Sequence, residues 1–318
     1  MTNILVRVAE ITEETAEIRT LRLVRDDGEP LGPYEAGAHI DVTGPTGLVR
    51  QYSLCGPPSE VSSLLIAVKR EPESRGGSEA LHTLSPGDHL KIGEPRNLLT
   101  VAGDADRHVL VAGGIGITPL LSMAYELAGR SADFELHYFV RSPGEAAFVD
   151  LLENRVELRD RVRLHFGAPR AEHPALLAAV VPGLTPASHV YTCGPQGFMD
   201  QVTAIFAPAI GENNVHVEHF TANEIDTSGD LPFTVELDTG EVFGIPAGKS
   251  ILSVLTENGI DVAKSCEEGI CGSCVSGILE GAPDHRDQCL SASDKAAGTE
   301  IALCVSRALS DKLVIELY

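Results

Sequence analysis

Four cysteines near the end of the chain have the residue type and spacing of iron ligands. Cys266, Cys271 and Cys274 form a C-x4-C-x2-C pattern, and Cys304 follows 30 positions after the third. Thiolates at this spacing hold plant-type [2Fe-2S] clusters. Glycines among them allow an irregular loop to turn its sulfurs inward. The sequence therefore predicts a [2Fe-2S] site, in which Ser265 and Ser273 can form hydrogen bonds to sulfur.

Two alternatives bear on this site. Structural zinc sites usually use two paired C-x2-C units or histidines, whereas only one close pair is present here. Cys289 also lies at a suitable distance to be the fourth ligand. We prefer Cys304 because its surroundings, ALCVSR, indicate a strand, whereas HRDQCLS around Cys289 indicates a turn with a spare thiol.

Two glycine-containing turns indicate a nucleotide site. In VLVAGGIGITPLLSM, Gly113, Gly114 and Gly116 lie where an apolar strand gives way to a helix, which presents N–H groups to a pyrophosphate. Thr192–Pro195 repeats this feature at a later strand end, where open parallel sheets bind ligands. The spacing is not G-x-G-x-x-G, and tight packing alone is the alternative. Cys193 taken alone is more typical of a small buried residue.

Two short segments in the first hundred residues suit a phosphorylated aromatic ligand. Arg50–Ser53, RQYS, offers a cation, a ring and a hydroxyl on one predicted strand, with Arg50 and Tyr52 on one face. An ordinary half-exposed strand is the alternative. Ser74–Ser78, SRGGS, precedes the helix-like EALHTL and supplies N–H groups, hydroxyls and an arginine for a phosphate. A simple turn is the alternative there.

The order of predicted elements divides the chain into three parts. Short apolar runs between Gly and Pro turn signals predict a small antiparallel β-barrel at residues 1–101. Strands alternate with helices over 102–225, which predicts an α/β domain with a parallel sheet. Residues 226–232 lack apolar periodicity and form a predicted linker. The α+β domain at 233–318 opens with the hairpin-like FTVELDTGEVFGIPAG and closes with the strand KLVIELY.

Composition restricts the classes of partner. The 318 residues are 43% hydrophobic and 22% charged, as in a globular protein with several cores. No apolar run reaches the roughly 18 to 20 residues of a membrane span, and the start lacks signal-peptide features, so we expect a cytoplasmic protein. The net charge of −22 disfavours nucleic acid and anionic membranes as partners. It favours a basic docking partner, with solubility alone as the alternative.

The chain as a whole resembles the phthalate dioxygenase reductase family, close to its vanillate O-demethylase reductases. The resemblance implies an FMN barrel, an NAD domain and a C-terminal β-grasp ferredoxin domain, in that order. The motifs that carry it are RQYSL at Arg50–Leu54, RGGS at Arg75–Ser78, PRN at Pro95–Asn97, GGIGITP at Gly113–Pro119, CGP at Cys193–Pro195, the four cysteines, and PDHRD at Pro283–Asp287.

The resemblance also implies roles for individual residues. FMN is implied, rather than FAD, because the family lacks adenine-binding elements and RGGS replaces a GPxS-type motif. Phe220, in HVEHF, matches an aromatic residue that covers the flavin, and Ser53 and Cys193 would lie with it at the reacting atoms. The implied binding residues are Arg50, Gln51, Tyr52, Ser53, Val68, Lys69, Gly76, Gly77 and Ser78 for the flavin, and Gly114, Gly116, Thr118, Cys193, Gly194 and Pro195 for the nicotinamide nucleotide.

The implied function is an NADH-dependent reductase. A flavin accepts two electrons together as hydride and releases them singly to a one-electron cluster. The acceptor would be a Rieske-type aromatic dioxygenase or O-demethylase that docks near the cluster loop, and we expect the reductase to be a monomer. Family resemblance favours NADH, although Arg141 could contact a 2′-phosphate. The alternatives are a reductase for a cytochrome P450, a non-catalytic flavin and iron–sulfur redox sensor, and a free-standing diaphorase.

Overall fold

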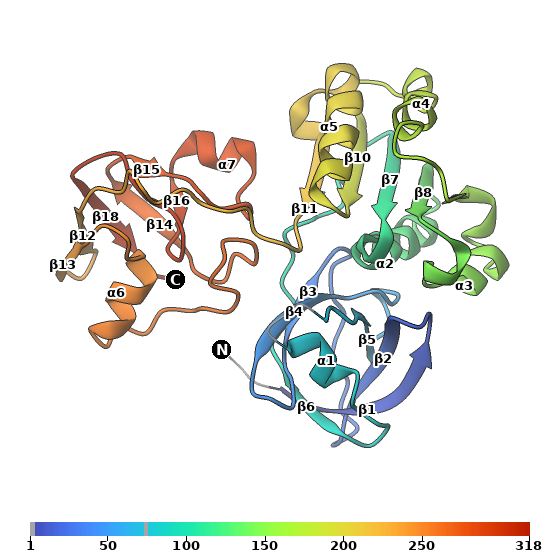
Figure 1. Ribbon diagram of the computed structural model, residues 1–318, viewed down its shortest axis with the longest axis horizontal. Helices are drawn as coiled ribbons and strands as arrows, with labels where there is room; N and C mark the ends of the chain where they lie inside the picture. Colours follow the sequence, from blue (N-terminus) through green and yellow to red (C-terminus); the bar gives the residue numbers. More distant parts are fainter. Residues whose placement is uncertain (1–3, 73–75) are drawn as a thin grey trace. The chain divides into compact units, whose positions relative to one another are not determined.

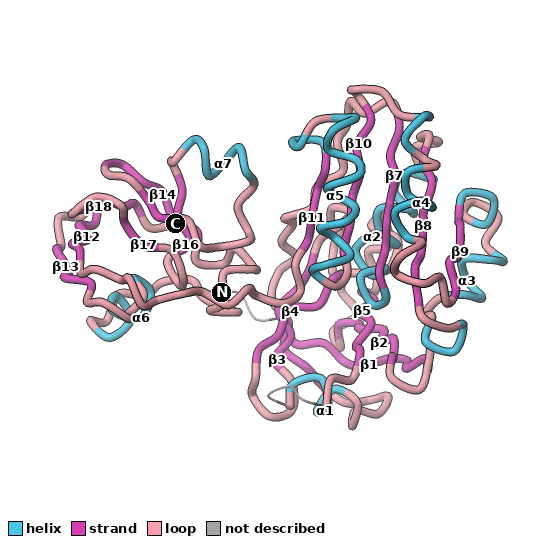
Figure 2. The backbone as a smooth tube through the Cα atoms, turned by 45° about the horizontal axis from the view of Figure 1, so that its top comes forward, coloured by secondary structure: helices cyan, strands magenta, loops and turns pink. Residues whose placement is uncertain are grey.

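The computed structural model describes residues 4–72 and 76–318, and these form two compact units. The first extends to Glu218 and the second runs from His219 to Tyr318. Ser74 and Arg75 of the predicted phosphate loop lie outside the described residues. In the part of the chain that is described, no helix is long and apolar enough to cross a membrane. Figures 1 and 2 show the elements of each unit.

An antiparallel sheet of six strands opens the first unit, in the order β4-β3-β6-β1-β2-β5. Alternating side chains such as Val6 and Val8 are fully buried, as expected where one face of a sheet packs on a core. A bridge between Leu54 and Ile66 brings the two edge strands together, so the sheet curls into a barrel. Its elements are β1 (Ile4–Glu13), β2 (Ile18–Arg25), β3 (His39–Thr43), β4 (Val49–Ser53), β5 (Leu64–Lys69), α1 (Gly77–Leu81) and β6 (His89–Ile92).

A parallel sheet in the order β11-β10-β7-β8-β9 follows in the same unit (Figure 2). Its central strand is buried almost throughout because helices pack on both faces. The elements are β7 (Arg107–Gly113), α2 (Ile117–Gly129), β8 (Phe134–Val140), α3 (Val149–Asn154), β9 (Val162–Phe166), α4 (His173–Ala178), β10 (Ser188–Cys193), α5 (Gln196–Ile210) and β11 (Val215–Glu218), with 3-10 turns η1 (Gly114–Gly116), η2 (Pro143–Glu145), η3 (Arg159–Arg161), η4 (Val181–Gly183) and η5 (Glu212–Asn214).

The barrel and the parallel sheet share a hydrophobic core. Ile18 and Cys55 of the barrel belong to the same buried cluster as Leu120 of α2. The Gly37 N–H donates to Ser122 Oγ at 2.9 Å. Gly37 has a φ of 90°, and a Cβ there would lie 2.2 Å from the carbonyl oxygen of Leu99. Only glycine allows this approach, so the junction is tightly packed.

The second unit contains a mixed five-stranded sheet in the order β13-β12-β18-β14-β16. The first two strands form the predicted hairpin, and β12 pairs in parallel with β18 at the end of the chain. Its apolar side chains pack on α6 to form a separate core. The elements are β12 (Phe233–Leu237), β13 (Val242–Ile245), α6 (Ile251–Glu257), β14 (Val275–Glu280), β15 (Pro283–Asp284), α7 (Ala292–Ala297), β16 (Glu300–Ala302), β17 (Arg307–Ala308) and β18 (Lys312–Glu316).

The predicted fold classes of all three parts are confirmed. One local prediction is wrong: Cys304 does not lie in a strand, because β16 ends at Ala302 and a turn carries the cysteine. A strand would alternate neighbouring side chains between two faces, whereas the turn directs the sulfur toward Cys274.

Candidate functional site

The four cysteines come together in the second unit as two pairs. The Cys266 N–H donates to Cys271 Sγ at 3.5 Å, and the thiol side chains of Cys274 and Cys304 are hydrogen-bonded to each other. Among the described residues, no three His, Cys, Asp or Glu side chains converge closely enough to hold one metal ion. Two pairs of sulfurs fit a two-iron cluster better than a single zinc ion.

The electrostatics of each pair prepare thiolates. A hydrogen bond from Cys271 lowers the pKa of Cys266 to about 5, and one from Cys304 lowers the pKa of Cys274. The donating thiols, Cys271 and Cys304, have raised pKa values for the same reason. Iron binds thiolate rather than thiol, so iron binding would release the remaining protons.

Hydrogen-bond donors from the loop also reach the sulfurs. The Glu268 N–H donates to Cys266 Sγ at 3.3 Å, and Ser273 Oγ lies 3.2 Å from Cys271 Sγ, which confirms the predicted contact of Ser273. Gly269 has a φ of 78°, and a Cβ there would lie 2.6 Å from Val305 Cγ2. The loop therefore needs glycine at this position to pack against the turn that carries Cys304.

Cys289 lies nearby but in a different setting. Its Sγ donates to Asp287 Oδ2 at 3.6 Å, and burial raises the pKa of its thiol. Cys304, not Cys289, pairs with Cys274. This geometry favours Cys304 as the fourth ligand.

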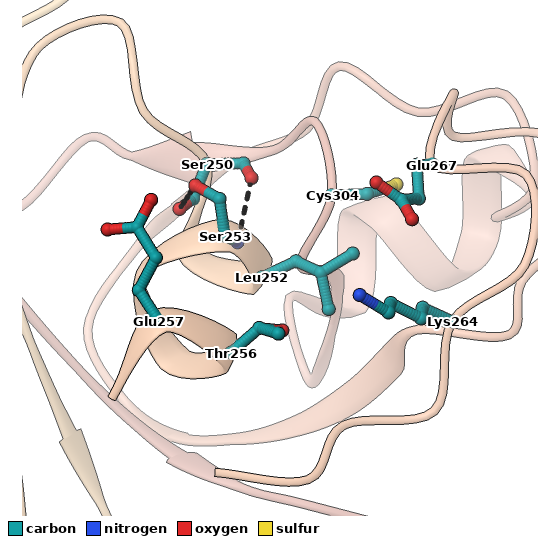
Figure 3. Close-up of a pocket in the computed structure, with 8 residues that line it drawn as sticks. All are labelled: Ser250, Leu252, Ser253, Thr256, Glu257, Lys264, Glu267 and Cys304. Carbon is teal, nitrogen blue, oxygen red and sulfur yellow. Dashed lines mark hydrogen bonds between the residues drawn. The ribbon is translucent and has the colours of Figure 1, made fainter. Parts of the chain in front are cut away.

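A hollow of about 260 Å³ opens beside Cys304 (Figure 3). Cys304 and Glu267 line one side, and residues of α6 line the other. It brings a predicted ligand sulfur close to the surface. The lining residues are Ser250, Leu252, Ser253, Thr256, Glu257, Lys264, Glu267 and Cys304.

The predicted flavin residues of β4 are neighbours in the barrel. Burial raises the pKa of Tyr52 to about 12, and the nearby charge of Arg50 partly opposes this effect. Arg50 Nη2 is buried without a hydrogen-bond partner among the described residues, while a Cβ on Gly77 would lie 3.1 Å from Arg50 Cγ. A buried guanidinium N–H beside the start of α1 is suited to an anionic phosphate.

The other predicted flavin residues differ in what they can offer. Ser53 is buried and pairs with His39 across the sheet, and Ser78 Oγ accepts from the Glu71 N–H at 3.0 Å. Val68 is fully buried in the barrel core, so only its backbone can reach a ligand. Lys69 forms an ion pair with Glu71. Gly76 has a φ of 87° at the start of α1, a conformation that favours glycine.

The two glycine turns of the predicted nucleotide site pack directly on each other. A Cβ on Gly116 would lie 2.2 Å from the Cys193 carbonyl oxygen, and one on Gly194 would lie 3.0 Å from Gly113 Cα. Gly114 has a φ of 56°. Among the described residues, no side chain caps α2 or α5. Backbone carbonyls accept from part of the first turns, because the Ile117 N–H donates to the Gly114 carbonyl oxygen and the Phe198 N–H donates to that of Pro195 at 2.9 Å. A strand end followed by a helix start still directs a positive helix end outward. This edge is suited to a pyrophosphate.

Thr118 and Pro195 are placed at the same edge. Thr118 is buried, and its Oγ1 donates to the Ile115 carbonyl oxygen at 3.0 Å, which fixes the first turn of α2. Pro195 is exposed immediately before α5. Burial raises the pKa of the Cys193 thiol well above its ordinary value, so Cys193 is a neutral thiol.

Comparison with known proteins agrees with this arrangement. Residues 235–309 match the 2Fe-2S iron-sulfur cluster binding domain family. The vanillate O-demethylase oxidoreductase of Pseudomonas sp. (strain HR199 / DSM 7063) is 43% identical over 95% of this chain and 96% of its own length. The solved phthalate dioxygenase reductase, described as a modular structure for electron transfer from pyridine nucleotides to [2Fe-2S], is 39% identical with a TM-score of 0.70, over 99% of this chain and 98% of that one.

The chain belongs to the phthalate dioxygenase reductase family. It is an oxidoreductase, the reductase component of an oxygenase system, with a [2Fe-2S] domain and with flavin and pyridine nucleotide as its other cofactors. A further solved structure, an intact type IV self-sufficient cytochrome P450 monooxygenase, is 35% identical with a TM-score of 0.89, over 98% of this chain and 41% of that one.

Glu218 of the reductase is a candidate site residue that the sequence analysis did not single out. It pairs in register with Cys193 at the ends of β11 and β10. Its Oε2 is shielded from water without a hydrogen-bond partner in the described residues, although part of the residue reaches the surface. This burial raises the pKa of Glu218 to about 8. In the sequence, this residue could have been found from its position within HVEHF, two residues before Phe220.

Asp41 is a second missed residue of the reductase. It is buried and accepts hydrogen bonds from Gln51 Nε2 at 2.7 Å and from Arg96 at 2.8 and 3.0 Å. The bidentate guanidinium fixes the carboxylate, which in turn holds the side chain of Gln51. Arg96 lies in the PRN motif, which was the only signal in the sequence.

Phe220 of the reductase lies at the start of the second unit, and 40% of it is exposed. An exposed phenyl ring near the boundary between the two units of the chain is suited to contact a planar ligand. Its predicted position over the flavin stays a prediction.

Proposed function

We propose that the reductase accepts a hydride from NADH at FMN and passes electrons singly through the [2Fe-2S] cluster to a Rieske-type aromatic dioxygenase or O-demethylase. The observation that supports this most is the full-length similarity to a vanillate O-demethylase oxidoreductase, over 95% of this chain and 96% of the relative. All three parts of such a relay are therefore present in one chain.

We assign the flavin to the barrel. Arg50, Tyr52 and Ser53 would bind it from β4, with Gln51 held by Asp41, while Val68 and Lys69 would contribute from β5. The phosphate would lie at Gly76, Gly77 and Ser78. The unpartnered Arg50 Nη2 beside Gly77 supports this position and is consistent with FMN, whose phosphate ends the cofactor.

We assign NADH to the edge where the two glycine turns meet. The glycine turns and the positive ends of α2 and α5 would bind the pyrophosphate, with Gly114, Gly116, Thr118, Gly194 and Pro195 around it. Cys193 and Glu218 would border the nicotinamide, while Ser53 and Phe220 would complete the hydride-transfer site. A neutral thiol and a neutral carboxyl place no charge next to the ring.

Anaerobic stopped-flow absorbance tests this function. Purified reductase mixed with NADH is expected to show flavin bleaching followed by cluster reduction, with about one FMN and two irons per chain on the same sample. NADPH is expected to react more slowly. A sample that lacks flavin, or that does not respond to NADH, would leave a ferredoxin-like redox sensor as the better account.

We place the oxygenase contact on the face that carries the cluster loop. The hollow beside Cys304 leads from the surface to a ligand sulfur, and the exposed Glu267 stands at its edge (Figure 3). Glu267 has a φ of 60°, which is unfavourable for a residue with a side chain, and it lines the hollow together with Glu257 and Lys264. An acidic rim would guide a basic surface of the partner.

The double variant E267Q/E268Q tests this contact. We expect electron transfer to the oxygenase to slow about tenfold at low ionic strength, with flavin reduction by NADH unchanged, because loss of negative charge slows association with a basic partner and leaves the flavin site intact. The effect should shrink as salt is added. The matched control E236Q/E241Q removes the same charge elsewhere in the second unit. Equal behaviour of the two variants would mean that the acidic excess serves solubility alone.

A cytochrome P450 is the second candidate acceptor. The similarity to part of a self-sufficient cytochrome P450 monooxygenase, at a TM-score of 0.89, favours it specifically. An assay with each purified acceptor distinguishes the two candidates. The true acceptor should convert its own substrate while the reductase oxidises NADH.

A further inference from the structure

The PDHRDQ segment, Pro283–Gln288, has contacts in two directions that the proposed electron path does not explain. One set reaches the cluster loop, and the other reaches residues 219–232, which connect the first unit to β12. We call residues 219–232 the connecting segment. All of these contacts lie within the second unit.

The connecting segment is held at two places. The Asn223 N–H donates to Gln288 Oε1 at 2.7 Å. Asp230, whose side chain is only 3% exposed, receives Arg286 Nη1 at 2.7 Å and faces Arg307 Nε at 3.4 Å. Arg307 also donates to the Leu231 carbonyl oxygen at 3.0 Å. A carboxylate buried between two guanidinium groups is held firmly, because separating it would leave charge unpaired away from water.

The same segment is fixed to the cluster loop. The Gln288 N–H donates to the Gly269 carbonyl oxygen at 2.8 Å, and a Cβ on Gly269 would lie 3.2 Å from Asp287 Cα. The Asp287 side chain is fully buried and accepts from Ser306 Oγ and the Leu290 N–H, both at 3.0 Å. PDHRDQ therefore links the loop that carries three cysteines to the chain that arrives from the first unit.

We propose that PDHRDQ is a clamp that anchors the connecting segment to the ferredoxin domain, with Asp230, Arg286 and Gln288 as positioning residues for electron transfer from flavin to cluster. This inference rests on the proposed function. The first contact between PDHRDQ and the chain after β11 is then at Asn223. The predicted linker at 226–232 lies inside the clamp instead of serving as a flexible joint.

The clamp changes how often flavin and cluster meet. The contact at Asn223 leaves four residues, 219–222, between Glu218 and PDHRDQ. Without the contacts of Asn223 and Asp230, Arg307 still holds Leu231, and twelve residues, 219–230, precede that anchor. Effective concentration falls roughly as the −3/2 power of linker length, so release of the clamp is expected to lower it about fivefold.

The variant D230A/Q288A tests the clamp. Arg286 keeps its pairing with Asp284, and Arg307 keeps its carbonyl partners, so the fold has no newly unpaired arginine. The Gln288 backbone contact with Gly269 also remains. The matched control E236A removes one negative charge from the same domain by breaking the Lys312–Glu236 ion pair.

Two measurements on the holoprotein test the effect of these substitutions. Hydrogen exchange of peptides covering 219–232 should become faster in D230A/Q288A and stay unchanged in E236A. In anaerobic stopped flow with NADH, cluster reduction should slow about fivefold in D230A/Q288A, with the rate of flavin bleaching unchanged. The electron paramagnetic resonance signal of the reduced cluster should also be unchanged, because no cluster ligand is altered.

The possible results distinguish a failure of the clamp from a failure of the proposed function. Unchanged exchange, or faster exchange without slower cluster reduction, would overturn the clamp. If D230A/Q288A does not retain its cluster, Q288A alone carries the same test with the Asp230 ion pair intact. Absence of cluster reduction in the unaltered protein would instead refute the proposed function.

Discussion

Replacement of Cys271 by Ser is expected to abolish NADH-dependent cytochrome c reduction while leaving most of the NADH–ferricyanide activity. Cys271 is one of the buried sulfurs, and its Sγ accepts from the Cys266 N–H at 3.5 Å. A serine oxygen is a poor substitute for a soft thiolate on iron. Ferricyanide can accept electrons from the flavin before they reach the cluster, whereas cytochrome c is expected to receive its electrons from the cluster.

The two activities are measured on one preparation, with flavin and iron assayed in parallel. C289S is the matched control, because Cys289 is a thiol of the same region that faces Asp287 rather than a paired cysteine. It should retain both activities and its iron. Equal loss of both activities in C271S would contradict the order flavin, then cluster.

The parts of the site that the sequence predicted are those encoded by local spacing. Three of the four cysteines lie within nine residues, and the glycine turns adjoin their strands, so short patterns identify them. Distance along the chain did not separate Cys304 from Cys289. Cys304 was preferred because its surroundings were interpreted as a strand, and that interpretation was wrong. ALCVSR has apolar residues at strand-like positions, and these are buried because the turn itself packs on the core, as Leu303 does.

The missed residues depend on partners far away in the sequence. Asp41 and Arg96 are 55 positions apart, and Asp230 and Arg286 are 56 apart. Each acidic residue alone is typical of a solvated position, and only tertiary packing makes it a buried anchor. The connecting segment shows this most clearly: its Asp, Ser, Gly and Pro content indicates a flexible linker, yet Arg286 and Arg307 bind it to the domain.

Replacement of Glu218 by Ala is expected to slow flavin reduction by NADH about ten- to a hundredfold, without loss of flavin or cluster. The shielded Glu218 carboxyl lies beside Cys193, and its Oε2 is available to a bound nicotinamide. A nicotinamide group left without its hydrogen-bond partner in a water-excluded site costs about 1–3 kcal/mol, which accounts for this range. E212Q, at an exposed glutamate before the same strand, is the control and should not change the rate.

The pH dependence separates a functional carboxyl from a merely structural one. Burial raises the pKa of Glu218 to about 8, so the carboxyl is a hydrogen-bond donor below this pH and loses its proton above it. Flavin reduction in the unaltered protein should therefore fall as the pH rises through about 8. E218Q, which stays neutral and keeps an N–H donor, should retain much of the rate and show no such decrease.

The raised pKa of Glu218 also predicts how the stability of the folded protein depends on pH. The unfolded chain releases this proton near pH 4.5, whereas the folded chain keeps it to about 8. The stability contributed by Glu218 is therefore fully present below pH 4.5 and is lost as the pH rises to about 8. Thermal unfolding of E218Q should depend less on pH across this interval than that of the unaltered protein. If E218Q flattens the unfolding curve but leaves the pH profile of flavin reduction intact, Glu218 is structural and the hydride site does not use it.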